Sequence, residues 1–310
     1  MKTKSAYRFF LFFTIPFIIL SCSERRSKPS DTINRNLYTN KDQNIPFAKQ
    51  RIVYQIPDME EVIKHKGIVY HSEKGIDLKM DLYIPPHIDK KRKLPIVILI
   101  NGHPDSVTNK DLGVNHKDLG YVVSWSELIA ASGMIAVTYE SQRSHFETDT
   151  LIRYLQKNAE TYNIDLNRMA IFGCSANTLT ALSLMQEPSY NIKCAIFYYG
   201  ILLTPDQKYF NKIDSAAKEY GCYWADLREI KKIPKEIPLF IVRAGKDKFQ
   251  IVKETTDYFV TEIINLNIPL TFINYAEGQH DFDVLDDTPT SRGIIKQTID
   301  FMHIYLLDDK

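Results

Sequence analysis

Hydrophobic residues along the chain form short strand-like patterns that alternate with longer helical ones. Residues 66–73 (KGIVYHSE) and 76–86 (IDLKMDLYIPP) alternate apolar and polar positions on either side of a short turn sequence. This alternation predicts an antiparallel pair of strands, half exposed to water. Six later runs are mainly apolar and predict further strands, over residues 94–102, 134–140, 168–173, 193–200, 237–245 and 268–276. The first of them, LPIVILING, is continuously apolar, as expected for a strand covered on both faces.

Between these runs, apolar residues recur with the period of an α-helix. The longest case is residues 147–165, where Leu151, Tyr154, Leu155 and Ala159 share one face of an expected amphipathic helix. Similar patterns predict helices over 124–133, 176–186, 252–267 and 292–307. Strict succession of strand and helix predicts an α/β fold with a mostly parallel central sheet and helices on both faces. Ligands of such sheets bind at the carboxyl ends of the strands.

Composition is consistent with a globular domain and excludes some partners. The chain has 310 residues, of which 44% are hydrophobic, so it can bury a large core. Its formal net charge of +1 gives no broad electrostatic field toward nucleic acid, and we expect no nucleic-acid partner. The cysteines give neither a disulfide framework nor the C-x-x-C pairs of a zinc site, so no metal is expected.

The first 21 residues predict an export signal rather than part of the fold. Lys2, Lys4 and Arg8 precede an apolar run over residues 9–20, which is too short to span a bilayer comfortably but suits a secretory signal. An ordinary signal peptide cut nearby and an uncleaved anchor are the simplest interpretations of such a segment.

The end of this apolar run favours a more specific interpretation. Leu20-Ser21-Cys22 resembles the lipobox of bacterial lipoproteins. By that resemblance Cys22 would be the lipidated first residue of the mature chain, anchored to a membrane of the bacterial cell envelope, facing the periplasm or the cell surface. Residues 22–49 are polar and predict a flexible tether, followed by one domain over 50–310.

Four loops that follow predicted strands carry residues suited to catalysis. They are residues 101–104 (NGHP), 173–177 (GCSAN), 244–247 (AGKD) and 277–281 (EGQHD). A serine, an acid and a histidine therefore occur in that chain order as Ser175, Asp247 and His280. Each of them alone is as consistent with an ordinary turn or loop residue.

Together these loops resemble those of the α/β-hydrolase superfamily, in particular its secreted esterases and its dienelactone-hydrolase or prolyl-oligopeptidase-like members. The resemblance covers most of the chain from about residue 66 and includes SWSELIAASGMIAVTYE, YNIDLNRMAIFGCSAN, VRAGKDKF and EGQHDFD. It implies an α/β-hydrolase fold, a small cap insertion over 201–235, and no cofactor. Aromatic residues of the cap would either grip the substrate or pack the cap onto the body.

The resemblance also implies a role for each loop residue. A serine hydroxyl is a weak nucleophile, so His280 would accept the proton of Ser175 while Asp247 orients the imidazole. The oxyanion would then bind to backbone N–H groups. These map to Ala176 and to His103, with Gly102 as an alternative to His103.

Several points stay open at the level of sequence. Asn177 stands where the G-x-S-x-G turn has its second glycine, and its side chain is large enough to distort that turn, although asparagine tolerates unusual backbone angles. Asp281, Asp283 and Asp286 compete with Asp247 as the acid. The His103 ring either lines the site or is exposed.

The function expected from this pattern is a serine hydrolase that cleaves a carboxylic ester through an acyl-enzyme. Its substrate would be a small-molecule or polysaccharide-linked ester. The alternatives are a prolyl-oligopeptidase-like peptidase and a non-catalytic binding protein on a hydrolase fold. Asn177 is the one feature that favours the non-catalytic alternative.

Overall fold

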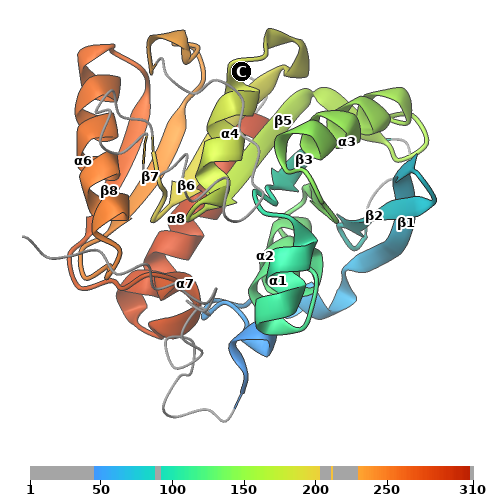
Figure 1. The fold of residues 1–310 in the computed structure, drawn as a ribbon, viewed down its shortest axis with the longest axis horizontal. Coiled ribbons are helices and arrows are strands. Elements are labelled where there is room, and N and C mark those ends of the chain that lie inside the picture. Colours follow the sequence, from blue (N-terminus) through green and yellow to red (C-terminus); the bar gives the residue numbers. More distant parts are fainter. Residues whose placement is uncertain (1–44, 88–91, 203–210, 212–229, 308–310) are drawn as a thin grey trace, which may run out of the picture.

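A computed structural model describes residues 45–87, 92–202, 211 and 230–307. The described strands form one sheet in the order β1-β2-β4-β3-β5-β6-β7-β8 (Figure 1). All neighbours from β4 to β8 are parallel, which confirms the predicted mostly parallel sheet. The strands are β1 (Ile63–Glu73), β2 (Ile76–Ile84), β3 (Leu94–Leu99), β4 (Ile135–Tyr139), β5 (Ile164–Cys174), β6 (Ile192–Tyr198), β7 (Leu239–Ala244) and β8 (Leu270–Tyr275).

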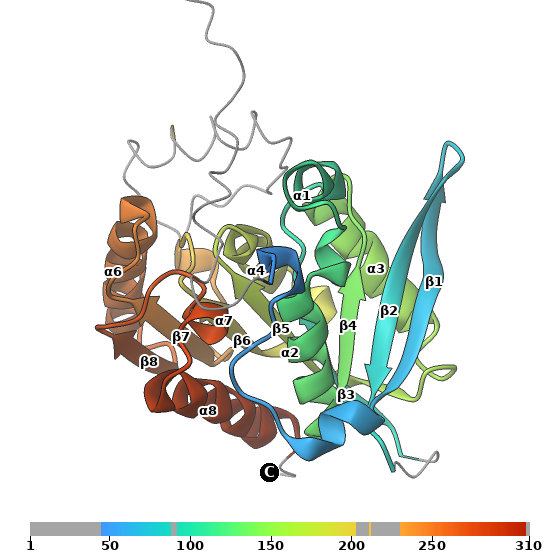
Figure 2. The same cartoon turned by 90° about the horizontal axis from the view of Figure 1, so that it is seen from below.

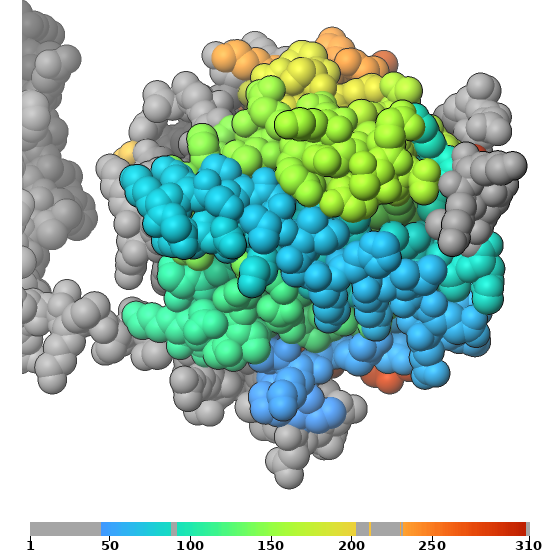
Figure 3. Space-filling view, turned by 90° about the vertical axis from the view of Figure 1, so that its right-hand side faces the viewer, coloured from blue at the N-terminus to red at the C-terminus, as the bar shows by residue number. Residues whose placement is uncertain are grey.

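The antiparallel pair predicted from alternation is the hairpin of β1 and β2. Its turn is made by Lys74 and Gly75, both with positive φ. Strand β2 also pairs antiparallel with β4, which attaches the hairpin to the parallel part of the sheet. Figure 3 looks onto this edge and shows the hairpin, in light blue, beside the yellow-green residues of α3 (His145–Lys157).

Helices cover both faces of the sheet (Figure 2). On one face, α3, α4 (Asn177–Met185) and α6 (Gln250–Asn265) pack on alternate strand residues such as Ile96 and Ile98; on the other, α2 (Gly120–Ala131) and α8 (Pro289–Leu306) pack on Val97 and Leu99. Burial on both faces explains why β3 reads as a continuous apolar run. The remaining described helices are α1 (Asp105–Leu112), α7 (Phe282–Leu285), η2 (Phe47–Lys49), η3 (Pro57–Glu61), η4 (His116–Asp118), η5 (Pro188–Tyr190) and η6 (Ile230–Lys232).

Two predicted boundaries differ from the structure. The helix predicted over 147–165 ends at Lys157, because the chain turns through Asn163, at φ 55°, before β5 begins. The folded domain also begins before the predicted boundary at residue 50. Phe47 is buried in the core next to Tyr121, and residues 47–49 already form η2.

Some sequence predictions lie outside the described residues. These are the signal peptide over 1–21, Cys22, the tether up to residue 44, and most of the cap predicted over 201–235. In the part of the chain that the structure describes, no helix combines the length and the apolar character needed to cross a bilayer.

Strand register brings the chemically interesting loops to one edge of the sheet. Cys174 pairs with Tyr198 at the ends of β5 and β6, and Ala244 pairs with Tyr275 at the ends of β7 and β8. The loops that carry Ser175, Asp247 and His280 therefore leave the sheet at neighbouring strand ends. This is the edge at which parallel α/β sheets bind their ligands.

Gly245 allows the loops after β7 and β8 to approach closely. A Cβ at this position would lie 2.3 Å from the Ala276 carbonyl oxygen, which is backbone and cannot move aside. We expect Gly245→Ala to lower the free energy of unfolding by about 1 to 3 kcal/mol, as overpacking does. Urea unfolding of the purified domain measures this change.

The matched control is Gly293→Ala in α8, where an added Cβ meets nothing within 4 Å. Alanine is the better helix former, so this variant should gain about 0.5 to 1 kcal/mol. A Gly245→Ala protein as stable as wild type would contradict the close approach.

Candidate active site

Ser175 lies at a strained turn between β5 and α4. Its φ of 54° falls in the left-handed region, which is uncommon for a residue other than glycine and is typical of a strand-turn-helix that exposes a nucleophile. The Ser175 N–H donates to Tyr198 O at 3.0 Å, and its carbonyl accepts the Ile201 N–H at 3.1 Å. The turn thus forms although Asn177 replaces the expected glycine.

The structure brings Ser175, His280 and Asp247 together from three separate loops. His280 Nε2 lies 3.0 Å from Ser175 Oγ, and His280 Nδ1 lies 2.6 Å from Asp247 Oδ2. The Asp247 side chain is fully buried and that of His280 is 13% exposed. This is the geometry in which a carboxylate orients an imidazole and the imidazole accepts a serine proton.

Backbone groups hold the acid in place. The Phe249 N–H donates to Asp247 Oδ1 at 2.8 Å, which leaves Oδ2 facing the imidazole. The Lys246 N–H donates to Gly278 O at 2.8 Å and ties the loop of the acid to that of the histidine. These bonds fix the acid independently of any substrate.

The competing acids have other partners. Asp283 is buried and accepts hydrogen bonds from Trp125 Nε1 at 2.7 Å and from the Tyr199 hydroxyl at 2.8 Å; burial raises its pKa to about 6. Asp286 accepts the Gln279 N–H at 3.1 Å. Both acids therefore anchor the segment around His280 rather than contacting its ring.

Charges around His280 favour its protonated form. Burial lowers the pKa of the ring, but the carboxylates of Asp281 and Asp247 outweigh burial and raise the pKa above its ordinary value. Asp281 follows the histidine with a φ of 58° at the start of α7. The ring is thus tuned to take up a proton more readily than a free imidazole.

Cys174 is a second potential nucleophile next to Ser175. Burial raises the pKa of its thiol well above the ordinary range, and the charge of Asp283 acts in the same direction. A protonated thiol is a poor nucleophile. Cys174 is therefore the weaker candidate nucleophile of the two residues.

The three candidate oxyanion donors have different partners. Among the described residues the Ala176 N–H has no acceptor, whereas the His103 N–H makes a long bond of 3.3 Å to Asn101 Oδ1. The Gly102 N–H donates to Asn177 Oδ1 at 2.8 Å. Of the two alternatives for the second donor, the Gly102 N–H is thus already engaged within the protein, which favours His103.

Buried polar groups support the loop between β3 and α1. Asp105 accepts the backbone N–H groups of His116 at 2.7 Å and of Ser141 at 2.6 Å, and burial raises its pKa to about 6. His103 is half-buried, and burial lowers the pKa of its ring to about 4, which keeps it neutral at physiological pH. The loop is therefore held by groups that sequence reasoning did not single out.

The sequence did not reveal the structural roles of Asn177, Asp105 and Ser144. The sequence left open whether Asn177 distorts the turn, whereas in the structure its side chain bonds the neighbouring loop. Ser144, which is buried, donates its hydroxyl to Gly102 O at 2.7 Å. No sequence pattern indicates such contacts between residues that are far apart in the chain. The one available clue is that Asp105 directly follows Pro104, the last residue of the loop at 101–104.

Residues 45–87, 92–202 and 230–307 contain no group of three or more His, Cys, Asp or Glu side chains placed to hold a metal ion.

Comparison with known sequences finds a distant relative. No model of a protein family matches the chain. A stretch of 164 residues, 49% of the chain, is 26% identical to “Probable dipeptidyl-aminopeptidase B” of Ajellomyces capsulatus (strain NAm1 / WU24). The match spans 17% of that much longer protein, so it concerns a part of it.

Comparison with solved structures finds esterases. Apo Thermogutta terrifontis esterase 2 matches with a TM-score of 0.62 and 15% identity over 82% of this chain and 98% of that one. A fungal esterase from Rhizomucor miehei matches with a TM-score of 0.58 and 13% identity over 84% and 86% of the two chains. The chain has the α/β-hydrolase fold. Butyrate-bound T. terrifontis esterase 2 also matches, with a TM-score of 0.57 and 15% identity over 82% and 98% of the two chains.

Within this α/β-hydrolase fold, the pKa of His280 is directly testable. We expect the ring to titrate above 6.5 and Asp281→Asn to lower that pKa, because the substitution removes a negative charge that favours the imidazolium. NMR titration of histidine-labelled protein measures both values.

Asp300→Asn serves as the control, since this exposed residue of α8 pairs with Lys296 and is not among the charges that raise the His280 pKa. A His280 pKa that is the same in wild type and Asp281→Asn would contradict the electrostatic origin of the shift.

Proposed function

We propose that this protein is a serine hydrolase that cleaves a carboxylic ester through an acyl-enzyme. One observation carries the proposal. His280 lies between Ser175 Oγ, at 3.0 Å, and Asp247 Oδ2, at 2.6 Å, at the strand edge where such folds bind ligands. The esterases with the same fold support ester hydrolysis as the reaction.

In the first half of the reaction, Ser175 Oγ attacks the ester carbonyl carbon. His280 Nε2 accepts the hydroxyl proton, and Asp247 stabilises the imidazolium that forms. The tetrahedral intermediate then collapses, His280 returns the proton to the alcohol oxygen, and the alcohol leaves. Water, deprotonated by the same imidazole, cleaves the acyl-enzyme and restores Ser175.

The negative charge on the carbonyl oxygen requires hydrogen-bond donors. We assign the first to the Ala176 N–H, which has no acceptor among the described residues, and the second to the His103 N–H, whose 3.3 Å bond to Asn101 Oδ1 is weak enough to exchange. Losing one such donor typically slows catalysis about 10²- to 10³-fold.

The proposed substrate is an ester with a small acyl group, on a small molecule or a polysaccharide. Support comes from T. terrifontis esterase 2, whose structures hold propionate and butyrate. The second candidate function is a peptidase, favoured by the 26% identity to a dipeptidyl-aminopeptidase. A non-catalytic role was favoured only by Asn177, and the turn at Ser175 forms with this residue in place.

Hydrolysis of p-nitrophenyl acetate, propionate, butyrate and octanoate tests the proposal. Wild-type protein should hydrolyse the short esters, and Ser175→Ala should lower kcat by at least about 10³-fold because no nucleophile remains. Ser189→Ala, which removes a serine hydroxyl bonded to Glu187 at 2.8 Å, is the control and should retain full activity.

Equal rates for wild type and Ser175→Ala would contradict the hydrolase. Cleavage of glycyl-prolyl-p-nitroanilide with no ester hydrolysis would instead identify the peptidase. Labelling by a fluorophosphonate that persists in Ser175→Ala would move the nucleophile to another residue.

We further propose that the protein is lipid-anchored to the cell envelope through Cys22. The support is the resemblance of Leu20-Ser21-Cys22 to a lipobox after an apolar run. Expressed in bacteria, the full chain should sediment with membranes and partition into detergent, whereas Cys22→Ala should lose the lipid and change fraction or molecular mass. A Cys22→Ala protein that stays membrane-bound with unchanged mass would contradict lipidation.

A further inference from the structure

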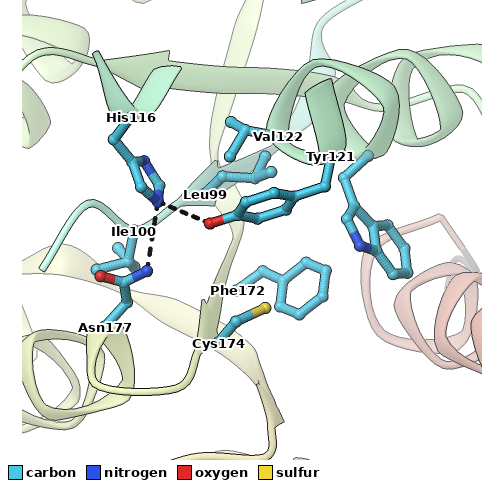
Figure 4. Close-up of a pocket in the computed structure, with 9 residues that line it drawn as sticks. Leu99, Ile100, His116, Tyr121, Val122, Phe172, Cys174 and Asn177 are labelled. Carbon is cyan, nitrogen blue, oxygen red and sulfur yellow. Dashed lines mark hydrogen bonds between the residues drawn. The ribbon is translucent and has the colours of Figure 1, made fainter. Parts of the chain in front are cut away.

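Asn177 bridges the turn of Ser175 and the loop after β3. Its side chain is 6% exposed, Oδ1 accepts the Gly102 N–H at 2.8 Å, and Nδ2 lies 3.3 Å from His116 Nε2 (Figure 4). The Tyr121 hydroxyl lies 3.3 Å from the same ring nitrogen. The figure shows Asn177 at the start of its helix with the amide pointing toward the imidazole.

Chemistry fixes the orientation of this amide. A backbone N–H can only donate, so the atom facing Gly102 must be the oxygen, and the Asn177 nitrogen then faces His116. Burial lowers the pKa of His116 to about 3, so its ring is neutral and Nε2 can accept a hydrogen bond. The buried ring therefore holds Asn177 with its oxygen toward the loop.

Ser144 holds the other side of Gly102. Its hydroxyl donates to Gly102 O at 2.7 Å, and its own backbone is strained at φ 35°. Because a trans peptide is planar, fixing the Gly102 carbonyl also fixes the direction of the His103 N–H on the opposite side of the same peptide. The orientation of one proposed oxyanion donor thus depends on a serine from another loop.

The loop after β3 and the turn of Ser175 are in direct contact at Gly102. A Cβ at Gly102 would lie 2.6 Å from Asn177 Cα and 2.9 Å from Asn177 Oδ1. The loop backbone therefore packs directly on the turn that carries Ser175, and its distance from the nucleophile is set by this contact.

We propose that Asn177 and Ser144 are positioning residues that clamp Gly102 from both sides and so present the His103 N–H, with that of Ala176, to the oxyanion. This inference rests on the proposed hydrolase function. Asparagine replaces a turn glycine here because its side chain takes up the Gly102 N–H, which leaves His103 as the second donor. Neither side chain is among the reacting groups of the proposed mechanism.

Steady-state kinetics of Asn177→Gly test the clamp. Glycine relaxes the turn rather than straining it, so any loss of rate comes from releasing the loop. Because the oxyanion exists only in the transition state, kcat should fall about 10- to 100-fold while KM changes less than about twofold. Ser144→Ala should show the same pattern, because it releases the Gly102 carbonyl.

Ser183→Ala is the matched control. Like Ser144, Ser183 carries a buried hydroxyl bonded to a neighbouring group, here His145 Nδ1 at 2.8 Å, but it does not contact Gly102. This variant should retain kcat. An Asn177→Gly enzyme with kcat within twofold of wild type, or a loss of the same size in Ser183→Ala, would overturn the proposal.

Hydrogen–deuterium exchange separates failure of the clamp from failure of the hydrolase. The Gly102 amide should exchange slowly in wild type and at least about tenfold faster in Asn177→Gly, because its acceptor is gone. This readout needs no activity. If the exchange rate of the Gly102 amide is the same in wild type and Asn177→Gly, the clamp is overturned even in an active enzyme. If wild type and Ser175→Ala hydrolyse esters equally fast, the proposed function is overturned. The exchange rates then still decide whether Asn177 holds the loop.

Discussion

The parallel pairing of β5, β6, β7 and β8 is the constraint on which the site depends. Hydrogen bonds between these strands set the height at which each one ends, and the three loops of the serine, acid and histidine leave from those ends. The side chains then need only short loops to meet. A slip in the register of β8 would displace His280 from both of its partners, whatever the loop sequence.

Around this frame, buried polar contacts rather than apolar packing give the loops their shape. Asp283 joins α7 to Trp125 of α2, while Asp105 joins α1 to His116 and Ser141. Each carboxylate accepts two or more hydrogen bonds, which offsets the cost of burying it. Such contacts are specific in direction, and they hold loops whose own sequences have no strong preference for one conformation.

The sequence predicts much of this arrangement because strands and helices leave periodic patterns. The apolar runs identified the strands of the sheet, and their ends pointed to Ser175, Asp247 and His280. The contact of Asn177 with Gly102 was out of reach, since 75 positions separate the two residues and no local pattern records the bond.

The sequence predicted the ends of helices and of the folded domain less well than the helices and strands themselves. The helical period continues past Lys157, where the chain in fact turns, because the same apolar residues can be buried from a turn as from a helix. Phe47 lies in a polar stretch typical of a tether, and only the tertiary structure shows that the core buries it. The composition of a segment reflects only its average polarity. The start of the domain depends instead on whether an individual side chain, here that of Phe47, is buried.

The path of residues 45–56 has a consequence for where the chain can be shortened. This segment runs along α2, where the Ile52 N–H donates to Ser124 Oγ, and the Val53 N–H donates to the Asp283 carbonyl next to the histidine loop. This segment, whose residues 45–49 were predicted to belong to the tether, is therefore bonded both to α2 and to the residues that follow His280. A shorter form of the protein that begins after residue 56 would lose these hydrogen bonds and leave the backbone of the segment after His280 without this support.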